Sequence, residues 1–457
     1  MSERQATRLR GPLGWGIAEL AIDRPVLWSM LQLWLPLSRL WAAALAAKGD
    51  PAAFLAAVPI DAKPTQRLAR KLEAFESHRR DYETAAEVWE EAFFAPNLKP
   101  PATLFRIEAR RASRARWLTL QRLRFLDIRF GRPVPPVRFE TASAAEVETA
   151  YGGYRTEPWR VYQPPDAVPN IEVSRRVSTS YGEDYWLRFR SPAARMGDAG
   201  PSRIAWARVH EPRGVVNPPT FIFGNGICVE FDHTGRATAD VQVLYKYGVR
   251  VIELESAWHG RRRLPGSYGG EPFMARAPLG PIDLFSAQAQ ELAVLIHWCR
   301  QQTKAPVAIG GASLGALAAL LAASHSPHWP QSMRPDAVAL LTVSDQIDSL
   351  IAESALSAGI GMAEALERAG WTAKDLMLWQ GLTQVPNGPP LPPENIVAVL
   401  GARDTILPFA SGRSLVERWR LPAENTFIGG AGHFSTPLGL AMDRRPLKRL
   451  ARILGAR

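Results

Sequence analysis

Cysteine is scarce in this chain. Only two cysteines occur in 457 residues, Cys228 and Cys299, and each lies inside an apolar run. Two thiols so far apart do not make the disulfide framework of a small secreted domain, so we expect buried free thiols and a reducing compartment. Neither C-x-x-C nor H-E-x-x-H occurs, and the eight histidines are scattered. We therefore expect no metal centre, and nothing in the sequence implies a cofactor.

The start of the chain lacks a long uninterrupted apolar run. Charges break every apolar stretch of residues 1–24, which predicts no secretory signal and a cytoplasmic protein. Residues 25–47 are heavily apolar and carry three tryptophans, but Arg39 lies near their middle, where a bilayer would make it costly. We favour a helix packed on the rest of the protein or in a homodimer interface. Peripheral contact with the inner face of a membrane stays open.

Acidic residues are outnumbered in the first part of the chain. Residues 1–140 hold 23 lysines and arginines against 15 acidic residues, and the whole chain has a net charge of +11. Two long helices are predicted here, over 65–94 and 102–130, and the second is rich in arginine. No known nucleic-acid-binding module accompanies them, so we expect a solvated or ion-paired face and no nucleic-acid partner. This N-terminal helical region (1–140) precedes a second domain over 141–457.

Strand and helix patterns alternate from about residue 185 onward. Short runs of β-branched and aromatic residues predict strands, and Ala- and Leu-rich stretches between them predict helices. Such alternation requires a mainly parallel sheet with helices on both faces. A helical stretch over about 347–390 interrupts the pattern, and we expect it to form a small insertion. The predicted class is α/β.

One glycine-rich turn stands out within the alternating region. Residues 305–324 contain a short apolar strand, the pentapeptide Gly311-Ala312-Ser313-Leu314-Gly315, and then a helix. The pentapeptide fits G-x-S-x-G, a sharp strand-to-helix turn that exposes a serine hydroxyl. Serine is a weak nucleophile and needs an adjacent base that is itself oriented by a carboxylate. On this architecture the partners should follow in the order Ser, Asp or Glu, His.

Both partners follow, each directly after a predicted strand. Asp404 lies in GARDTILP after the run NIVAVL, and His433 lies in GGAGHF after the run TFI. We predict that Ser313 is the nucleophile, His433 the base and Asp404 the carboxylate that orients it. Asp345 and Asp348 follow the strand before the insertion and stay open as alternative acids.

At these residues the sequence resembles the α/β-hydrolase superfamily, over about 185–455. GASLG is similar to its nucleophile elbow, GARDTILP to its acid loop and GGAGHF to its histidine loop. The esterase-like and dienelactone-hydrolase-like branches look nearest. The resemblance implies the α/β-hydrolase fold, with the insertion and the N-terminal helical region added to it, and a small-molecule ester as substrate.

The resemblance also implies an oxyanion hole made of two backbone N–H groups. Leu314, the residue after the serine, is one predicted donor, and Ile227 is the other. Asn225 stands where the family often has a histidine. We expect Asn225, His259 and Arg261 to border the substrate pocket, where Arg261 could hold a substrate carboxylate.

We therefore expect a serine hydrolase that cleaves a carboxylic ester through an acyl-enzyme. An amidase, a thioesterase or an acyltransferase would use the same residues. Residues 25–47 and the basic helices motivate the alternative of a membrane-associated lipase or acyltransferase. A non-catalytic scaffold that binds a partner is a third hypothesis, which the ordered Ser, Asp and His disfavour. The acyl and alcohol groups do not follow from the sequence.

Overall fold

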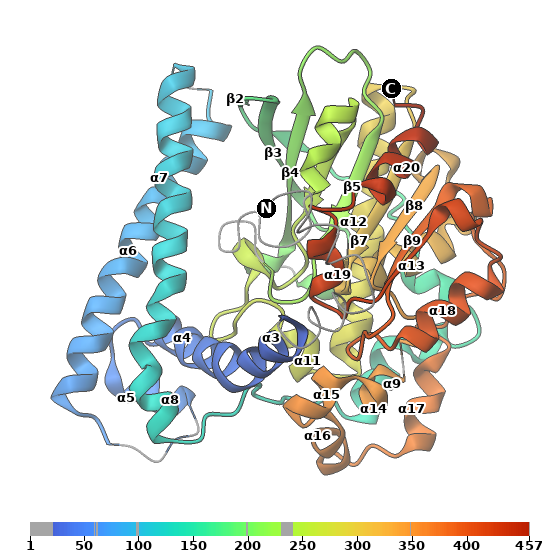
Figure 1. Cartoon of the computed structure of the whole chain (residues 1–457). Helices are drawn as coiled ribbons and strands as arrows, with labels where there is room; N and C mark the ends of the chain where they lie inside the picture. Colours follow the sequence, from blue (N-terminus) through green and yellow to red (C-terminus); the bar gives the residue numbers. More distant parts are fainter. Residues whose placement is uncertain are drawn as a thin grey trace.

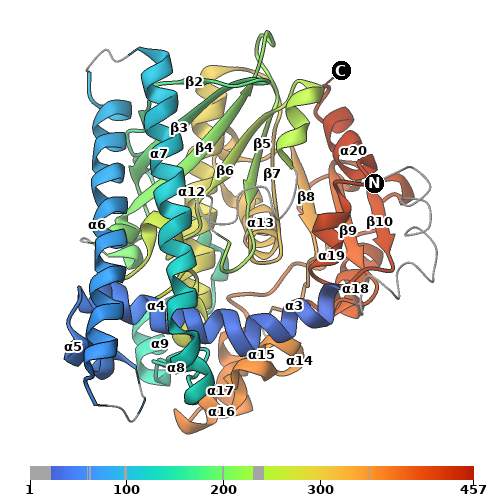
Figure 2. The same cartoon turned by 60° about the vertical axis from the view of Figure 1, so that its left-hand side comes forward.

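A computed structural model of the protein describes residues 22–58, 60, 63–96, 100–197, 200–229, 241–347 and 349–456. Two predictions concern residues that lie entirely or mostly outside these ranges. They are the absence of a secretory signal, which concerns residues 1–24, and the alternative acid Asp348. A central sheet forms the middle of the molecule, and a group of N-terminal helices lies beside and below it (Figures 1 and 2).

The described strands form one ten-stranded sheet with the order β1-β3-β4-β6-β5-β7-β8-β9-β10, in which β2 pairs with β3. Their bounds are β1 Glu172–Val173, β2 Val177–Ser178, β3 Gly182–Arg190, β4 Ile204–Pro212, β5 Thr220–Gly224, β6 Arg250–Leu254, β7 Val307–Ala312, β8 Ala337–Leu341, β9 Ile396–Gly401 and β10 Thr426–Gly429. Strand β4 runs antiparallel to β3 and β6, whereas every neighbouring pair from β6 to β10 is parallel.

Every residue of the central strands β5 to β9 is buried. Neighbouring side chains of one strand belong to hydrophobic clusters on opposite faces of the sheet. On β7, Ile309 belongs to the cluster that includes helices α12 and α13, and Ala308 belongs to the cluster that includes α20. Strands covered on both faces favour continuous apolar runs, which is why these segments were recognisable. The structure confirms the predicted α/β class with its mainly parallel sheet.

Helices cover both faces of the sheet and extend the molecule below it (Figure 1). Their bounds are α3 Arg24–Ser29, α4 Leu35–Ala47, α5 Pro51–Ala57, α6 Gln66–Phe94, α7 Pro101–Leu120, α8 Leu126–Gly131, α9 Ala144–Tyr151, α11 Glu271–Ala275, α12 Leu279–Gln302, α13 Leu314–His325, α14 Leu350–Glu353, α15 Ala355–Ile360, α16 Met362–Arg368, α17 Ala373–Gln380, α18 Phe409–Arg418, α19 Ser435–Gly439 and α20 Arg445–Ile453. Helices α14 to α17 form the predicted insertion. The boundary between domains at residue 140 stays a prediction.

Helices α6 and α7 stand side by side next to the sheet (Figure 2). An aromatic cluster attaches them there, because the ring of Trp89 on α6 lies 5.6 Å from that of Trp186 on β3 and 6.1 Å from that of Trp206 on β4. Burial of such large rings is among the stronger contributions to packing between elements. The predicted N-terminal helical region is therefore present and is packed against the sheet.

Residues 22–47, here called the strap, run below the sheet as α3, a π-helical turn (Met30–Trp34) and α4 (Figure 2). Leu35 to Ala44 are buried, and the guanidinium of Arg39 forms a 2.7 Å ion pair with the carboxylate of Glu271. This part of the apolar segment packs on the rest of the protein, which is the arrangement that the sequence favours. In the described part of the chain, no helix combines the length and apolar character needed to cross a bilayer. Peripheral membrane contact, a homodimer and a cytoplasmic location stay predictions.

Candidate active site

Ser313 lies at the turn between β7 and α13. Its backbone has φ 55° and ψ −120°, a left-handed conformation that residues other than glycine adopt only when their surroundings impose it. The N–H of Ser313 donates a 3.0 Å hydrogen bond to the carbonyl oxygen of Leu341 on the neighbouring strand β8. The turn is thus held by the sheet itself.

Two glycines make this turn possible. A Cβ atom on Gly311 would lie 2.2 Å from the carbonyl carbon of Gly315, and one on Gly315 would lie 2.1 Å from the carbonyl oxygen of Gly224. No side chain fits at these distances, because strand β7, helix α13 and strand β5 meet there backbone to backbone. This is the physical reason for the G-x-S-x-G spacing in this chain.

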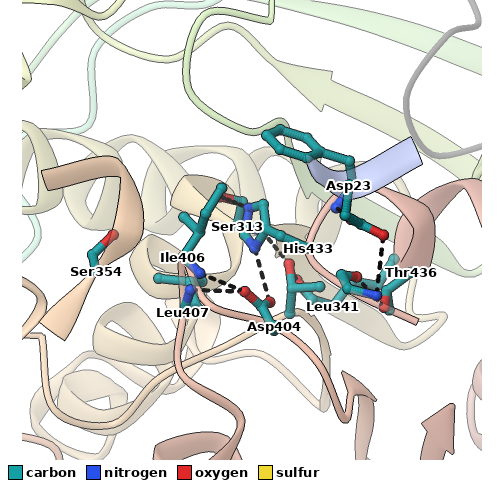
Figure 3. Close-up of polar contacts among 12 residues, drawn as sticks. Asp23, Ser313, Leu341, Ser354, Asp404, Ile406, Leu407, His433 and Thr436 are labelled. Carbon is teal, nitrogen blue, oxygen red and sulfur yellow. Dashed lines mark hydrogen bonds and ion pairs between the residues drawn. The ribbon is translucent and has the colours of Figure 1, made fainter. Parts of the chain in front are cut away.

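His433 connects Ser313 to Asp404 (Figure 3). Nε2 of His433 lies 2.9 Å from Oγ of Ser313, and Nδ1 lies 2.8 Å from Oδ2 of Asp404. Asp404 follows β9 and His433 follows β10, and these two strands are parallel neighbours. Their carboxyl ends lie at the same edge of the sheet, so residues 29 positions apart come into contact. The structure brings together the three residues that sequence order selected.

The carboxylate of Asp404 is held in one orientation. Its Oδ1 accepts the backbone N–H groups of Ile406 and Leu407, each at 2.9 Å, which leaves Oδ2 for His433 (Figure 3). Both side chains are buried, with 6% of Asp404 and 8% of His433 exposed. A buried carboxylate with every oxygen bonded holds the imidazole with little freedom.

The alternative acid Asp345 has other partners. Its Oδ1 accepts the hydroxyl of Ser411 at 2.6 Å, and its Oδ2 accepts Nη1 of Arg418 at 2.5 Å. The carboxylate that contacts His433 is that of Asp404. Between Asp404 and Asp345, the geometry favours the predicted Asp404.

The loop after β5 passes beside Ser313. Gly224 pairs with Gly311 across the strands, and a Cβ atom built on Gly226 would lie 3.5 Å from Cβ of Ser313. Ile227, the next residue, lines the same cavity as Ser313 and Leu314. Both residues predicted to supply backbone donors therefore line the cavity together with the serine.

His259 and Arg261 do not lie where the sequence led us to expect. His259 is 1% exposed, accepts the N–H of Cys228 at Nε2 (3.2 Å) and donates from Nδ1 to the carbonyl oxygen of Ala257 (2.9 Å). Through the hydrogen bond to Cys228, His259 supports the loop that carries Ile227. The sequence left a structural role for His259 open beside the pocket, but it did not indicate which loop His259 would support, because that loop is 31 residues away.

Arg261 lies in the aromatic cluster rather than at the pocket. Its guanidinium carbon is 4.3 Å from the ring centre of Trp186, a cation–π contact, and its side chain is largely buried. The residues that line the cavity include neither Arg261, His259 nor Asn225. Arg261 is thus not positioned to hold a substrate carboxylate, because the tryptophans of α6, β3 and β4 surround it.

A cavity of about 390 Å³ opens at Ser313. Its walls come from α11, α12, α13 and the insertion, with Leu317, Ile347, Ile360, Met362, Trp379 and Ile406 among the side chains that line it. No charged side chain of the described residues lines it. In the part of the chain that the structure describes, no cluster of His, Cys, Asp or Glu side chains is arranged to hold a metal ion.

Sequence analysis missed Asp23, which precedes α3. Its carboxylate accepts the backbone N–H groups of Phe434 (2.7 Å) and Ser435 (3.1 Å), directly after His433 (Figure 3). More than 400 positions separate these partners, and no local pattern in the sequence signals the contact.

No protein-family model and no curated protein matches this sequence. Among solved structures, similarity is found to acetyl xylan esterase 1 from Thermoanaerobacterium sp. JW/SL YS485 (14% identity, TM-score 0.45, 66% of this chain and 93% of that one). Similarity is also found to an S-formylglutathione hydrolase from Agrobacterium tumefaciens (15% identity, TM-score 0.41, 62% of this chain and 99% of that one). At such identities and TM-scores the likeness carries no argument about activity. The strand order, the turn at Ser313 and the positions of Asp404 and His433 after β9 and β10 show that this chain has the α/β-hydrolase fold.

Proposed function

We propose that this protein is a serine hydrolase that cleaves carboxylic esters. The observation that carries the proposal is the hydrogen-bonded series Ser313, His433 and Asp404 at one end of an apolar cavity (Figure 3). His433 takes the proton of the Ser313 hydroxyl as Oγ attacks the carbonyl carbon of the ester, and Asp404 stabilises the imidazolium that forms. The alcohol leaves with that proton, the acyl group stays on Oγ, and water then releases it as the acid.

The negative oxygen of the tetrahedral intermediate needs hydrogen-bond donors. Leu314 is the first residue of α13, where backbone N–H groups have no partner within the helix and the helix dipole favours negative charge. Ile227 lines the same cavity and lies on the loop that His259 supports. We propose that the N–H groups of Leu314 and Ile227 donate hydrogen bonds to this oxygen. They would stabilise the tetrahedral intermediate both when the acyl-enzyme forms and when water cleaves it.

The cavity supports an uncharged, apolar acyl group. Aliphatic side chains dominate its walls, and no charged side chain of the described residues faces into it. Placing a substrate carboxylate there would cost its hydration without supplying an ionic partner. The same triad would cleave a thioester or an amide through the same acyl-enzyme.

Acyl-chain preference tests this proposal. We expect kcat/KM for p-nitrophenyl esters to rise from acetate to octanoate, since each buried methylene is worth about 0.8 kcal/mol, roughly fourfold. An initial burst of one p-nitrophenol per enzyme would report the acyl-enzyme. Ser357→Trp places an indole in the cavity wall and should lower kcat/KM for octanoate by about 50-fold, the value of three methylenes, while acetate is spared.

Leu378→Trp is the matched control, because Leu378 is on the same insertion but is exposed and does not line the cavity. It should leave the chain-length series unchanged. A wild-type series that is flat from acetate to octanoate would contradict the assignment of this cavity to the acyl group.

One exposed face favours a second candidate, a membrane-associated lipase or acyltransferase. The continuous helical stretch over residues 101–131 exposes large apolar side chains to between 51% and 71%, namely Phe105, Trp117, Leu120, Leu123 and Phe130. Exposed arginines alternate with them, namely Arg106, Arg110, Arg116 and Arg124. Aromatic and aliphatic residues combined with arginines are typical of helices that lie on an anionic lipid surface.

Vesicle sedimentation separates the two candidates. If the second holds, the protein should sediment with phosphatidylglycerol vesicles and not with phosphatidylcholine vesicles, and high salt should release it. Trp117→Ser with Leu120→Ser should lower the vesicle partition coefficient about 100-fold, as expected for two apolar side chains worth about 1.5 kcal/mol each. Sedimentation with neither vesicle type would leave the soluble-ester reaction as the function.

A further inference from the structure

The strap reaches the active site through Asp23. Asp23 stands at the N-cap position of α3, where an aspartate normally accepts N–H groups of its own helix, yet its side chain makes no such bond. It is only 8% exposed, and its carboxylate faces the loop that carries His433 (Figure 3). Because this buried carboxylate does not cap its own helix, both of its oxygens can accept hydrogen bonds from the histidine loop.

That carboxylate is bonded on both oxygens. Oδ1 accepts the N–H groups of Phe434 (2.7 Å) and Ser435 (3.1 Å), while Oδ2 accepts the N–H of Gly432 (3.3 Å) and the hydroxyl of Ser435. Gly432 and Phe434 are the neighbours of His433 in the chain. The peptide groups on both sides of the histidine are therefore tied to one side chain by charge-assisted hydrogen bonds.

The histidine loop is shaped for this contact. A Cβ atom on Gly432 would lie 2.5 Å from Cγ of Asp23, so only glycine allows the carboxylate to approach the backbone so closely. Among the described residues, no cation forms an ion pair with Asp23, and its partners are the groups of this loop. The contact is specific to the segment that carries His433.

The strap also contacts the wall of the cavity. A Cβ atom on Gly359 of α15 would lie 2.4 Å from Cδ1 of Leu31, so the π-helical turn of the strap packs directly on α15. Leu356, Ser357 and Ile360 of the same helix line the cavity. One N-terminal segment thus spans the histidine loop and the acyl-binding insertion.

We propose that Asp23 is a positioning residue: its carboxylate holds the loop so that Nε2 of His433 stays within hydrogen-bond distance of Oγ of Ser313. The inference rests on the proposed hydrolase function. Asp23 touches neither the reacting atoms nor the cavity, and it acts only through the backbone around His433. Displacing a catalytic group by about 1 Å can cost about 100-fold in rate, which sets the size of effect to expect.

The direct test is Asp23→Asn. Asparagine keeps the shape and one acceptor oxygen, but its NH₂ group cannot accept a hydrogen bond. The backbone N–H groups on one side of the side chain, those of Phe434 and Ser435 or that of Gly432, therefore lose their acceptor. We expect kcat for ester hydrolysis to fall by about 10- to 100-fold while KM stays within about twofold, because substrate contacts are untouched. Fluorophosphonate labelling of Ser313 should slow by the same factor.

Two further variants make the result interpretable. Asp50→Asn is the matched control, since Asp50 also accepts two backbone N–H groups (2.9 and 3.3 Å) but at the start of α5. It should leave kcat unchanged, and thermal stability should change little because asparagine caps a helix about as well as aspartate. Ser435→Ala removes the hydroxyl that donates to Asp23 and accepts the N–H of Gly432 (2.9 Å), and it should lower kcat about threefold.

The NMR signals of the His433 imidazole report the environment of the ring without any substrate. They are assigned by their absence from the spectrum of His433→Gln. A folded Asp23→Asn protein with wild-type kcat and wild-type His433 signals would overturn the inference. If Asp23→Asn does not fold, Ser435→Ala decides, and an unchanged kcat and unchanged signals overturn it. If the wild type neither hydrolyses esters nor reacts with fluorophosphonate, the proposed function fails, and shifted His433 signals in Asp23→Asn would still support positioning.

Discussion

Ser313→Ala is expected to lower kcat for ester hydrolysis by about 10⁶-fold, the scale of loss when a serine hydrolase loses its nucleophile. Alanine has no oxygen to attack the ester, while the cavity and the N–H groups of Leu314 and Ile227 remain. Intact-protein mass after fluorophosphonate treatment should show one adduct on the wild type and none on the variant. The fold should persist, because the turn is held by Gly311, Gly315 and the bond from residue 313 to Leu341.

Ser354→Ala is the matched control for this experiment. Ser354 lines the same cavity, but it projects from the insertion on the far side and has no contact with His433 (Figure 3). The control should take up one adduct at the wild-type rate. An adduct that persists in Ser313→Ala would place the nucleophile on another residue and would end the proposal.

Asp404→Asn should lower kcat by about 10⁴-fold with little change in KM. The Oδ1 atom of asparagine would keep the N–H groups of Ile406 and Leu407, which turns its NH₂ group toward Nδ1 of His433. Nδ1 must then accept a hydrogen bond, so the ring proton moves to Nε2. That nitrogen lies 2.9 Å from Oγ of Ser313 and can no longer take its proton. Steady-state kinetics with a saturating ester measures the effect.

Asp345→Asn separates the two aspartates that follow neighbouring strands. Asp345 is bonded to Ser411 and Arg418, so we expect a lower unfolding temperature and an almost unchanged kcat below it. A 10⁴-fold loss in Asp345→Asn, with activity retained in Asp404→Asn, would make Asp345 the acid instead.

Local backbone requirements made much of this site predictable. A turn as sharp as that at Ser313 requires glycine where strand and helix backbones meet. Gly311 and Gly315 meet this requirement within one pentapeptide, so the turn can be recognised from the sequence. Buried parallel strands require apolar runs, so the positions of β7 and β9 followed from composition. Parallel strands end at one edge of the sheet, which is why residues after three different strands could be assigned to one site.

Other features depend on contacts between segments that are far apart in the chain. Asp345 and Asp404 look alike in the sequence, and only the packing shows which carboxylate reaches His433. Arg261 was expected at the pocket, but tryptophans contributed by α6, β3 and β4 surround its guanidinium.

Asp23 shows the same limit most clearly. A hydrogen bond between side chain and backbone imposes no periodicity and needs no particular neighbour in the sequence, so a partner more than 400 residues away leaves no local trace. The positions of the buried strands and the turn at Ser313 follow from short-range steric and burial rules that the sequence carries, whereas the order of the strands in the sheet does not. The choice of acid, the environment of Arg261 and the support of the histidine loop arise only when distant elements pack together.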